Sequence, residues 1–137
     1  IVKAVAFYER ACETGDVKGC TNAGYIYDIG EGVPENKAKA LQLYETGCDG
    51  GDAKGCFNAG VTFATGDGVK ADQPRAFRLF ERACDGKHAQ GCYNVGVRYA
   101  QGKGVKADDA KAKLFFRRAL AIDPDMEQAR RALAIFE

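Results

Sequence analysis

The sequence contains no serine, a single histidine and no long run of apolar residues. Without serine the chain has no seryl nucleophile, which excludes hydrolases of the Ser-His-Asp type. Because His88 is the only histidine, the chain cannot form a metal site that needs two or more histidine ligands. No segment approaches the roughly 20 apolar residues that span a bilayer, so we expect no membrane insertion.

Charge of either sign is also not in excess. The 137 residues carry 20 basic and 19 acidic side chains, a formal net charge of +1. This balance argues against nucleic acid or an anionic membrane surface as the main partner. No segment resembles a secretion signal, and the chain begins at Ile1 instead of Met. We therefore expect a processed protein or a piece of a longer one.

What the sequence does contain is an internal repeat of 36 residues. Cys12, Cys48 and Cys84 are 36 residues apart, and a second cysteine follows each of them eight residues later, at Cys20, Cys56 and Cys92. The same step relates Asn22, Asn58 and Asn94, then Gly24, Gly60 and Gly96, and the aromatic residues Tyr27, Phe63 and Tyr99. So many positions in phase predict a repeat protein of stacked units.

Within each unit the apolar residues follow helical spacing. The predicted apolar faces are Ala40, Leu41, Tyr44 and Cys48, their equivalents Ala76, Phe77, Phe80 and Cys84, and, on a second helix, Cys56, Ala59, Gly60 and Phe63. Gly66 predicts a left-handed helix end, and Asp72 can cap the helix that follows. No segment alternates as a strand does. The pattern therefore predicts an all-α chain of antiparallel helix pairs, stacked into a right-handed α/α solenoid.

The repeat also predicts the organisation of the domain. We expect one repeat domain over 1–137, with a half repeat at 1–14, full units at 15–50, 51–86 and 87–122, and a C-terminal capping helix at 123–137. Terminal repeats are commonly atypical, because one of their faces has no neighbour. On the last helix Leu133 and Phe136 are expected to cap the core; a docking surface for another domain or subunit is the alternative.

The paired cysteines admit three interpretations. If Cys12 ends one helix and Cys20 begins the next, the turn brings their Cα atoms to the separation of about 5–6 Å that a disulfide needs. Alternatively, the cysteines are reduced and buried as small apolar side chains. The third interpretation is zinc, although the C-x-x-C spacing typical of zinc sites is missing. We favour disulfides, which imply an oxidising compartment.

Three segments, 55–63, 66–72 and 75–84, resemble the Sel-1-like repeat, a relative of the tetratricopeptide repeat. The cysteines eight residues apart are similar to those of the secreted Helicobacter cysteine-rich protein family, in which each such pair is a disulfide between neighbouring helices. The resemblance implies three structural disulfides and a secreted or periplasmic location. Residues 119–125 instead resemble a plain tetratricopeptide repeat junction.

Solenoids bind partners along their concave wall. With Ala59, Gly60 and Phe63 packed inward, other positions of the same helix should face the groove. The candidate partner-binding residues are Asn22, Tyr25, Ile29, Phe57, Asn58, Val61, Tyr93, Asn94 and Val97. An asparagine amide can pair with the backbone of an extended peptide, and aromatic residues can anchor partner side chains. The alternative for the asparagines is a hydrogen bond that holds neighbouring repeats together.

We therefore expect a scaffold that binds a protein or peptide segment in its groove, with no cofactor and no metal. Two alternatives remain at this stage. The first alternative is an enzyme-like role, which the resemblance implies because some cysteine-rich relatives have been assigned penicillin binding or β-lactamase activity. The other is a spacer among further repeats or domains of a parent chain. His88 is expected to be an exposed surface residue without a role in function.

Overall fold

A computed structural model describes the chain from residue 2 to residue 136, with side chains from residue 4 onward. Ile1 and Glu137, the ends of the first and last predicted units, lie outside the described residues. Over the described range the chain forms eight helices and no strand. They are α1 (Val2–Glu13), α2 (Val17–Ile29), α3 (Lys37–Asp49), α4 (Ala53–Thr65), α5 (Gln73–Asp85), α6 (Ala89–Gln101), α7 (Asp109–Ile122) and α8 (Glu127–Ile135). The predicted all-α solenoid of helix pairs is confirmed.

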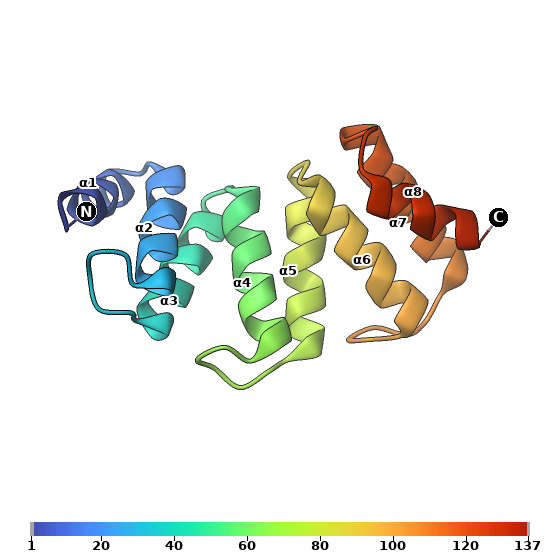
Figure 1. Cartoon of the computed structure of the whole chain (residues 1–137), viewed down its shortest axis with the longest axis horizontal. Coiled ribbons are helices and arrows are strands. Elements are labelled where there is room, and N and C mark those ends of the chain that lie inside the picture. Colours follow the sequence, from blue (N-terminus) through green and yellow to red (C-terminus); the bar gives the residue numbers. More distant parts are fainter. Residues whose placement is uncertain (1, 137) are drawn as a thin grey trace.

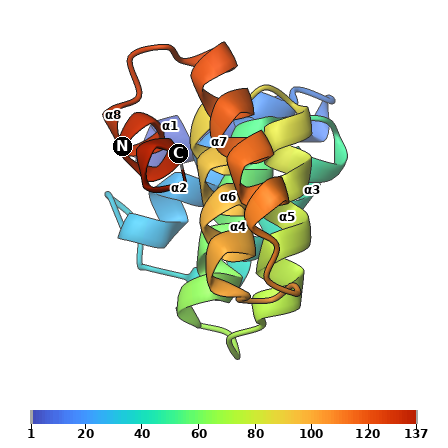
Figure 2. The ribbon, with the colours of Figure 1, turned by 90° about the vertical axis from the view of Figure 1, so that its right-hand side faces the viewer.

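The helices follow one another along a single row, with the two ends of the chain at opposite ends of the row (Figure 1). Seen along this row, α2, α4 and α6 lie on one side of the stack, and α3 and α5 lie on the other (Figure 2). The longest helix, α7, has 14 residues. Between residues 2 and 136, no helix combines the length and the apolar character needed to cross a bilayer.

Two kinds of residue mark the helix ends, as the sequence predicts. Gly66 follows α4 with φ of 70°, a left-handed conformation that glycine adopts without strain, and its N–H donates to the carbonyl of Thr62. The Asp72 carboxylate accepts a hydrogen bond from the Arg75 N–H and so caps α5. Asn36 and Asp108 cap α3 and α7 in the same way.

The core is built from the predicted apolar faces, all of which are buried. Tyr44, Phe80 and Phe116 occupy equivalent positions of α3, α5 and α7 and are at most 2% exposed. Each ring lies against a glycine of the preceding helix. A Cβ atom on Gly60, for example, would lie only 2.9 Å from Cε1 of Phe80. Glycine at this position therefore allows the two helices of a pair to pack closely around the ring.

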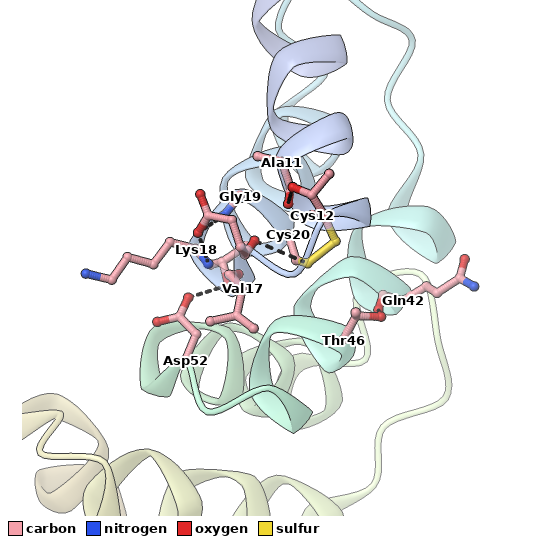
Figure 3. The surroundings of a disulfide bond; sticks show 12 residues. Ala11, Cys12, Val17, Lys18, Gly19, Cys20, Gln42, Thr46 and Asp52 are labelled. Atoms are coloured by element: carbon pink, nitrogen blue, oxygen red, sulfur yellow. Dashed lines mark hydrogen bonds between the residues drawn. A yellow bond between two sulfur atoms is a disulfide. The ribbon is translucent and has the colours of Figure 1, made fainter.

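All six cysteines form disulfides, in the pairs Cys12–Cys20, Cys48–Cys56 and Cys84–Cys92. The Cα–Cα distances are 4.6, 4.4 and 4.5 Å. Figure 3 shows the first bond between the end of α1 and the first turn of α2. Each disulfide ties the end of one helix pair to the start of the next. The disulfide interpretation is confirmed. No cysteine is free, so the interpretations as reduced core cysteines and as zinc ligands do not apply.

Charged side chains repeat the same 36-residue step along the other side of the stack. Arg82 pairs with Asp49 at 3.3 Å, and Arg118 pairs with Asp85 at 3.2 Å. These pairs join α5 to α3 and α7 to α5 respectively. They are largely exposed, so each contributes little to stability by itself. Their regularity shows that the helix pairs stack in one constant register.

Candidate partner-binding groove

The residues predicted to face a partner lie on α2, α4 and α6, and their exposure varies. Tyr25 is 53% exposed, Ile29 48% and Val61 36%, while Val97 is partly buried. Tyr25, Val61 and Val97 are equivalent positions in three successive units. They place one accessible apolar or aromatic side chain on each of the three helices. We call the surface formed by α2, α4 and α6 the groove face.

The aromatic candidates Phe57 and Tyr93 are half-buried and take part in packing between helices. The Phe57 ring lies 5.5 Å from that of Phe80 and 4.6 Å from that of His88. The Tyr93 ring lies 5.7 Å from that of Phe116. Both rings therefore stabilise the stack and present only part of their surface to the groove face.

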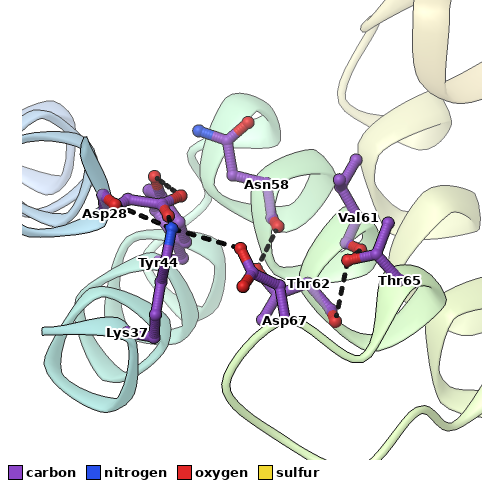
Figure 4. A network of polar contacts seen from close by, with 8 residues as sticks. All are labelled: Asp28, Lys37, Tyr44, Asn58, Val61, Thr62, Thr65 and Asp67. Atoms are coloured by element: carbon purple, nitrogen blue, oxygen red, sulfur yellow. Dashed lines mark hydrogen bonds and ion pairs between the residues drawn. The ribbon is translucent and has the colours of Figure 1, made fainter.

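The three predicted asparagines are all partly exposed. The amide oxygen of Asn94 accepts a hydrogen bond of 3.5 Å from Nε2 of Gln90, on the same helix. The Asn58 side chain lines the same cavity as Asp28 and Asp67 but takes no part in their polar contacts (Figure 4). Within residues 2–136, no hydrogen bond joins the side chain of Asn22 or Asn58 to a neighbouring repeat. These two amides therefore remain available to a partner.

Two cavities open on the groove face, one on each side of α4. The first, of about 210 Å³, is lined by Tyr25, Asp28, Tyr44, Phe57, Asn58, Val61, Thr62, Thr65 and Asp67. The second, of about 260 Å³, is lined by Val61, Ala64, Thr65, Phe80, Asn94, Val97, Arg98, Gln101 and Lys103. Val61 and Thr65 line both, so the two cavities are neighbours across one helix. Apart from Phe57, each lining residue of the first cavity has its equivalent, 36 positions later, in the lining of the second.

A network of polar contacts joins side chains that line the first cavity to Lys37 (Figure 4). The Lys37 ammonium lies 2.5 Å from Oδ1 of Asp28 and 3.1 Å from Oδ2 of Asp67. The Tyr44 hydroxyl donates a 2.9 Å hydrogen bond to Oδ2 of Asp28. The hydrogen bond with Asp28 raises the pKa of Lys37 above its ordinary value, and the bond with Asp67 adds a smaller contribution in the same direction. Two carboxylates of the cavity lining thus share one cation, Lys37.

The side chains that line the second cavity carry the opposite net charge. Arg98 and Lys103 stand where the first cavity has Thr62 and Asp67. In place of Lys37 it has the neutral Gln73, whose Oε1 accepts a 2.8 Å hydrogen bond from Nη1 of Arg98. The acidic first cavity and the basic second cavity therefore occupy the same place in consecutive repeats.

His88 is half-buried, and the expectation that it is an exposed surface residue is wrong. It stands at the N-cap of α6, where Nδ1 accepts a 3.1 Å hydrogen bond from the Gly91 N–H. Burial lowers the pKa of His88, and Lys54 acts in the same direction while Asp52 opposes it. One repeat earlier the equivalent Asp52 accepts a 2.5 Å hydrogen bond from the Thr21 hydroxyl. His88 therefore has a structural role in the helix start.

The charged residues of the two cavities were not among the residues predicted from the sequence. The signal lies in positions where the repeat is broken. Arg98 is equivalent to Ile26 and Thr62, which are also buried. An arginine among buried apolar or hydroxyl residues is a departure from the pattern that the alignment of the units displays.

Comparison with known proteins agrees with the repeat and with the fold. A family model described as Sel1 repeat matches residues 1–16, 17–52, 53–88 and 89–123. Among curated proteins, cytochrome c oxidase assembly factor 7A of Xenopus laevis is 49% identical over 37 residues. That match spans 27% of this chain and 16% of the frog protein. The likeness is thus limited to about one repeat.

Solved structures resemble the whole arrangement. A Sel1 repeat protein from Oxalobacter formigenes superposes with a TM-score of 0.86 at 26% identity, covering 95% of this chain and 96% of that one. Cysteine-rich protein B of Helicobacter pylori gives 0.75 at 27% identity, with 94% and 91% covered. Protective antigen c5321 of uropathogenic Escherichia coli, described as having an SLR fold, gives 0.81 at 29% identity over 86% of this chain and 25% of the antigen.

Proposed function

Because the chain belongs to the Sel1 repeat family, whose members generally mediate protein interactions, we propose that it binds an extended segment of a partner protein along the groove face. The observation that carries the proposal is the pair of adjoining cavities on α2, α4 and α6. The residues proposed to contact the partner are Asn22, Tyr25, Ile29, Phe57, Asn58, Val61, Tyr93, Asn94 and Val97. Sel1 repeat scaffolds are generally not enzymes.

Two features of the groove face support a peptide ligand. Tyr25 and Val61 have accessible apolar surface whose burial against a partner favours binding. The partly exposed amides of Asn58 and Asn94 can form hydrogen bonds with an extended backbone. Since Val61 and Thr65 line both cavities, one segment that crosses α4 contacts both at once. Solenoids use such extended surfaces for partner recognition.

The proposal extends to the setting of the protein. Three disulfides are consistent with an oxidising compartment, and the proposed location is the periplasm or the exterior of the cell. The proposed organisation is a single repeat domain in which α8 closes one end of the stack. Leu133 and Phe136 support this, because both pack against the core.

Site-specific photo-crosslinking tests the binding face. A benzophenone amino acid is placed at Tyr25 or Val61 on the groove face, and, as the matched control, at Gln42, an exposed residue of α3. The oxidised chain is illuminated in an extract of the source cells. We expect the same adduct from both groove positions and none from Gln42. Equal labelling from Gln42, or no adduct from either groove position, contradicts the proposal and favours the spacer.

A further inference from the structure

Arg98 is a buried cation without a carboxylate beside it. It lies in the wall of the second cavity and is only 7% exposed. Nη1 donates to the neutral Oε1 of Gln73, and Cζ lies 5.2 Å from the centroid of the Phe80 ring. Over residues 2–136 no acidic side chain forms an ion pair with it, and burial lowers the pKa of its guanidinium. Buried charges are normally paired, so this charge is left uncompensated by the chain's own side chains.

The fold does not require an arginine at this position. The equivalent residues of the two preceding units are Ile26, 7% exposed, and Thr62, 9% exposed. Both units form the same helix pair without a cation there. Arg98 is therefore a specific property of the second cavity and not a part of the repeated packing.

The other residues around Arg98 complete a site for an anion with an apolar stem. Lys103 adds a second cation, and the amides of Asn94 and Gln101 add N–H donors. Val61, Ala64, Val97 and Phe80 supply apolar surface in the same cavity. None of the residues that line it is acidic. A guanidinium has five N–H donors, of which the bond to Gln73 uses one.

We propose that the second cavity binds the side-chain carboxylate of an aspartate or glutamate in the partner segment. This inference rests on the proposed function and names the chemistry that the groove face selects. Arg98 holds the carboxylate through charge-assisted hydrogen bonds, and Lys103 adds attraction from the rim of the cavity. The methylene groups of the acidic side chain pack against Val61, Val97 and Phe80. The partner thereby supplies the anion that the chain itself lacks at Arg98.

The first cavity provides an internal contrast. Asp28 and Asp67 face it, and Lys37 is already engaged by both. A carboxylate placed there is repelled by these two like charges. Because the cation Lys37 is already paired with both aspartates, binding of a carboxylate in the first cavity is disfavoured. The acidic side chain of the partner therefore selects the α4–α6 side of the groove face over the α2–α4 side.

A small probe tests the cavity without any peptide. Arginine Nε–Hε signals of the oxidised protein are followed by ¹⁵N NMR during titration with N-acetylglutamate N-methylamide. We expect a saturable shift of the Arg98 signal, with a dissociation constant on the order of 1 mM as suits a fragment. The neutral control N-acetylglutamine N-methylamide should leave the signal in place. No saturable shift, or equal shifts from both compounds, overturns the proposal.

The chain offers its own matched variants. Arg98→Thr installs the residue of the preceding repeat and should abolish the response, seen at the Asn94 and Gln101 side-chain amides. Asp67→Asn, in the first cavity, should leave it unchanged. Arg98→Lys keeps the charge but not the planar pair of donors, and should weaken binding only in part. If Arg98→Thr does not fold by circular dichroism, Lys103→Ala replaces it, and an unchanged affinity in that variant counts against the site.

A selected peptide then identifies the source of the carboxylate. Random peptides displayed on phage are selected on the oxidised protein, and a selected peptide is made in three forms: unchanged, with its acidic residue replaced by the amide, and with an amidated C-terminus. Replacing the acidic residue by its amide should weaken binding of the peptide to the natural protein about 10-fold or more. The same replacement should not weaken binding to the Arg98→Thr variant. Amidation of the C-terminus should have no effect.

The outcomes separate this inference from the broader proposal. A groove-binding peptide whose affinity does not depend on an acidic side chain, or depends on its C-terminal carboxylate, overturns the inference and leaves the proposed function standing. If no peptide binds the groove face, the proposed function fails. In that case a response to the small acid assigns the cavity to free carboxylates, which also overturns the role of a partner's side chain.

Discussion

The two cavities on the groove face have the same architecture and opposite charge. In the first, Lys37 bridges Asp28 and Asp67; in the second, Arg98 and Lys103 face no carboxylate of the lining. Backbone position is set by the 36-residue period, and the charge is set by the few side chains that do not follow it. The contrast teaches that in this chain the repeated residues build the scaffold and the unrepeated ones decide what it recognises.

The largest expected effect concerns what the two cavities share. The disulfide Cys48–Cys56 joins α3 to α4 in the repeat of the first cavity, and Cys84–Cys92 joins α5 to α6 one repeat later. Replacing either pair by alanine should lower the free energy of unfolding by about 2.5 kcal/mol, from the loop entropy of a closure of this length. Urea unfolding of the two double variants should give similar losses. A large difference between them would show that the two repeats are not equivalent scaffolds.

The next effect concerns the shared cation of the first cavity. Lys37→Gln introduces the residue found at the equivalent position one repeat later, Gln73. It leaves Asp28 and Asp67 without their counter-ion. We expect a loss of about 1 kcal/mol in the free energy of unfolding, since Lys37 and Asp28 are partly buried while Asp67 is exposed to solvent. Urea unfolding at neutral pH measures this loss, with replacement of the exposed Lys70, Lys70→Gln, as the control. An unchanged stability would mean that solvent screens the network fully.

The period of the sequence explains why the fold was predictable and the cavity chemistry was not. Helix pairs, glycine contacts and disulfides recur at a constant step, so a single chain displays them three times over. Lys37 reaches Asp67 because the loop after α4 packs directly on Lys37, where Gly68 leaves room for its side chain. That approach depends on the loop conformation and has no local signal. Arg98 did have a signal, since it departs from Ile26 and Thr62, but repeated residues alone do not reveal it.

Removing the cation of the second cavity should have the opposite sign to Lys37→Gln. Arg98 is buried without an ion pair, so Arg98→Thr relieves a desolvation cost and should raise the free energy of unfolding by up to about 1 kcal/mol. The gain is limited because contact with the Phe80 ring is lost. Thermal and urea unfolding of the free protein check the sign. A loss above about 1 kcal/mol would make Arg98 a structural residue and break the contrast.

The N-cap residues of α4 and α6 give a smaller, pH-dependent difference between the two repeats. His88 accepts a hydrogen bond from Gly91 in its neutral form, and burial lowers its pKa. The unfolded chain binds a proton at about pH 6.5, its ordinary value, and the folded chain only at lower pH. The unfolded state therefore binds more protons in this window, so stability falls as pH decreases from about 6.5 through the folded pKa.

His88→Asp isolates this dependence, because Asp is the residue of the two preceding repeats, at Asp16 and Asp52. The difference in unfolding free energy between the natural chain and the variant should change between pH 7.5 and 5.5, in the direction of a weaker natural chain at the lower pH. Comparing the two proteins cancels the contribution of ionisable groups that the substitution leaves in place, such as Glu81, whose pKa is raised by burial. A constant difference would exclude His88 as the source.

The smallest effect on stability is expected at the residue that we place most firmly in binding. Tyr25 is 53% exposed, so Tyr25→Ala should change the free energy of unfolding by no more than about 0.5 kcal/mol. Tyr93→Ala is the matched control, because that ring packs against Phe116 and should cost about 1–2 kcal/mol. Affinity for a groove-selected peptide should fall in both variants, but only in Tyr25→Ala without a change in melting temperature. If Tyr25→Ala binds the peptide normally, recognition is confined to the basic second cavity, and the acidic first cavity serves only to hold the repeats together.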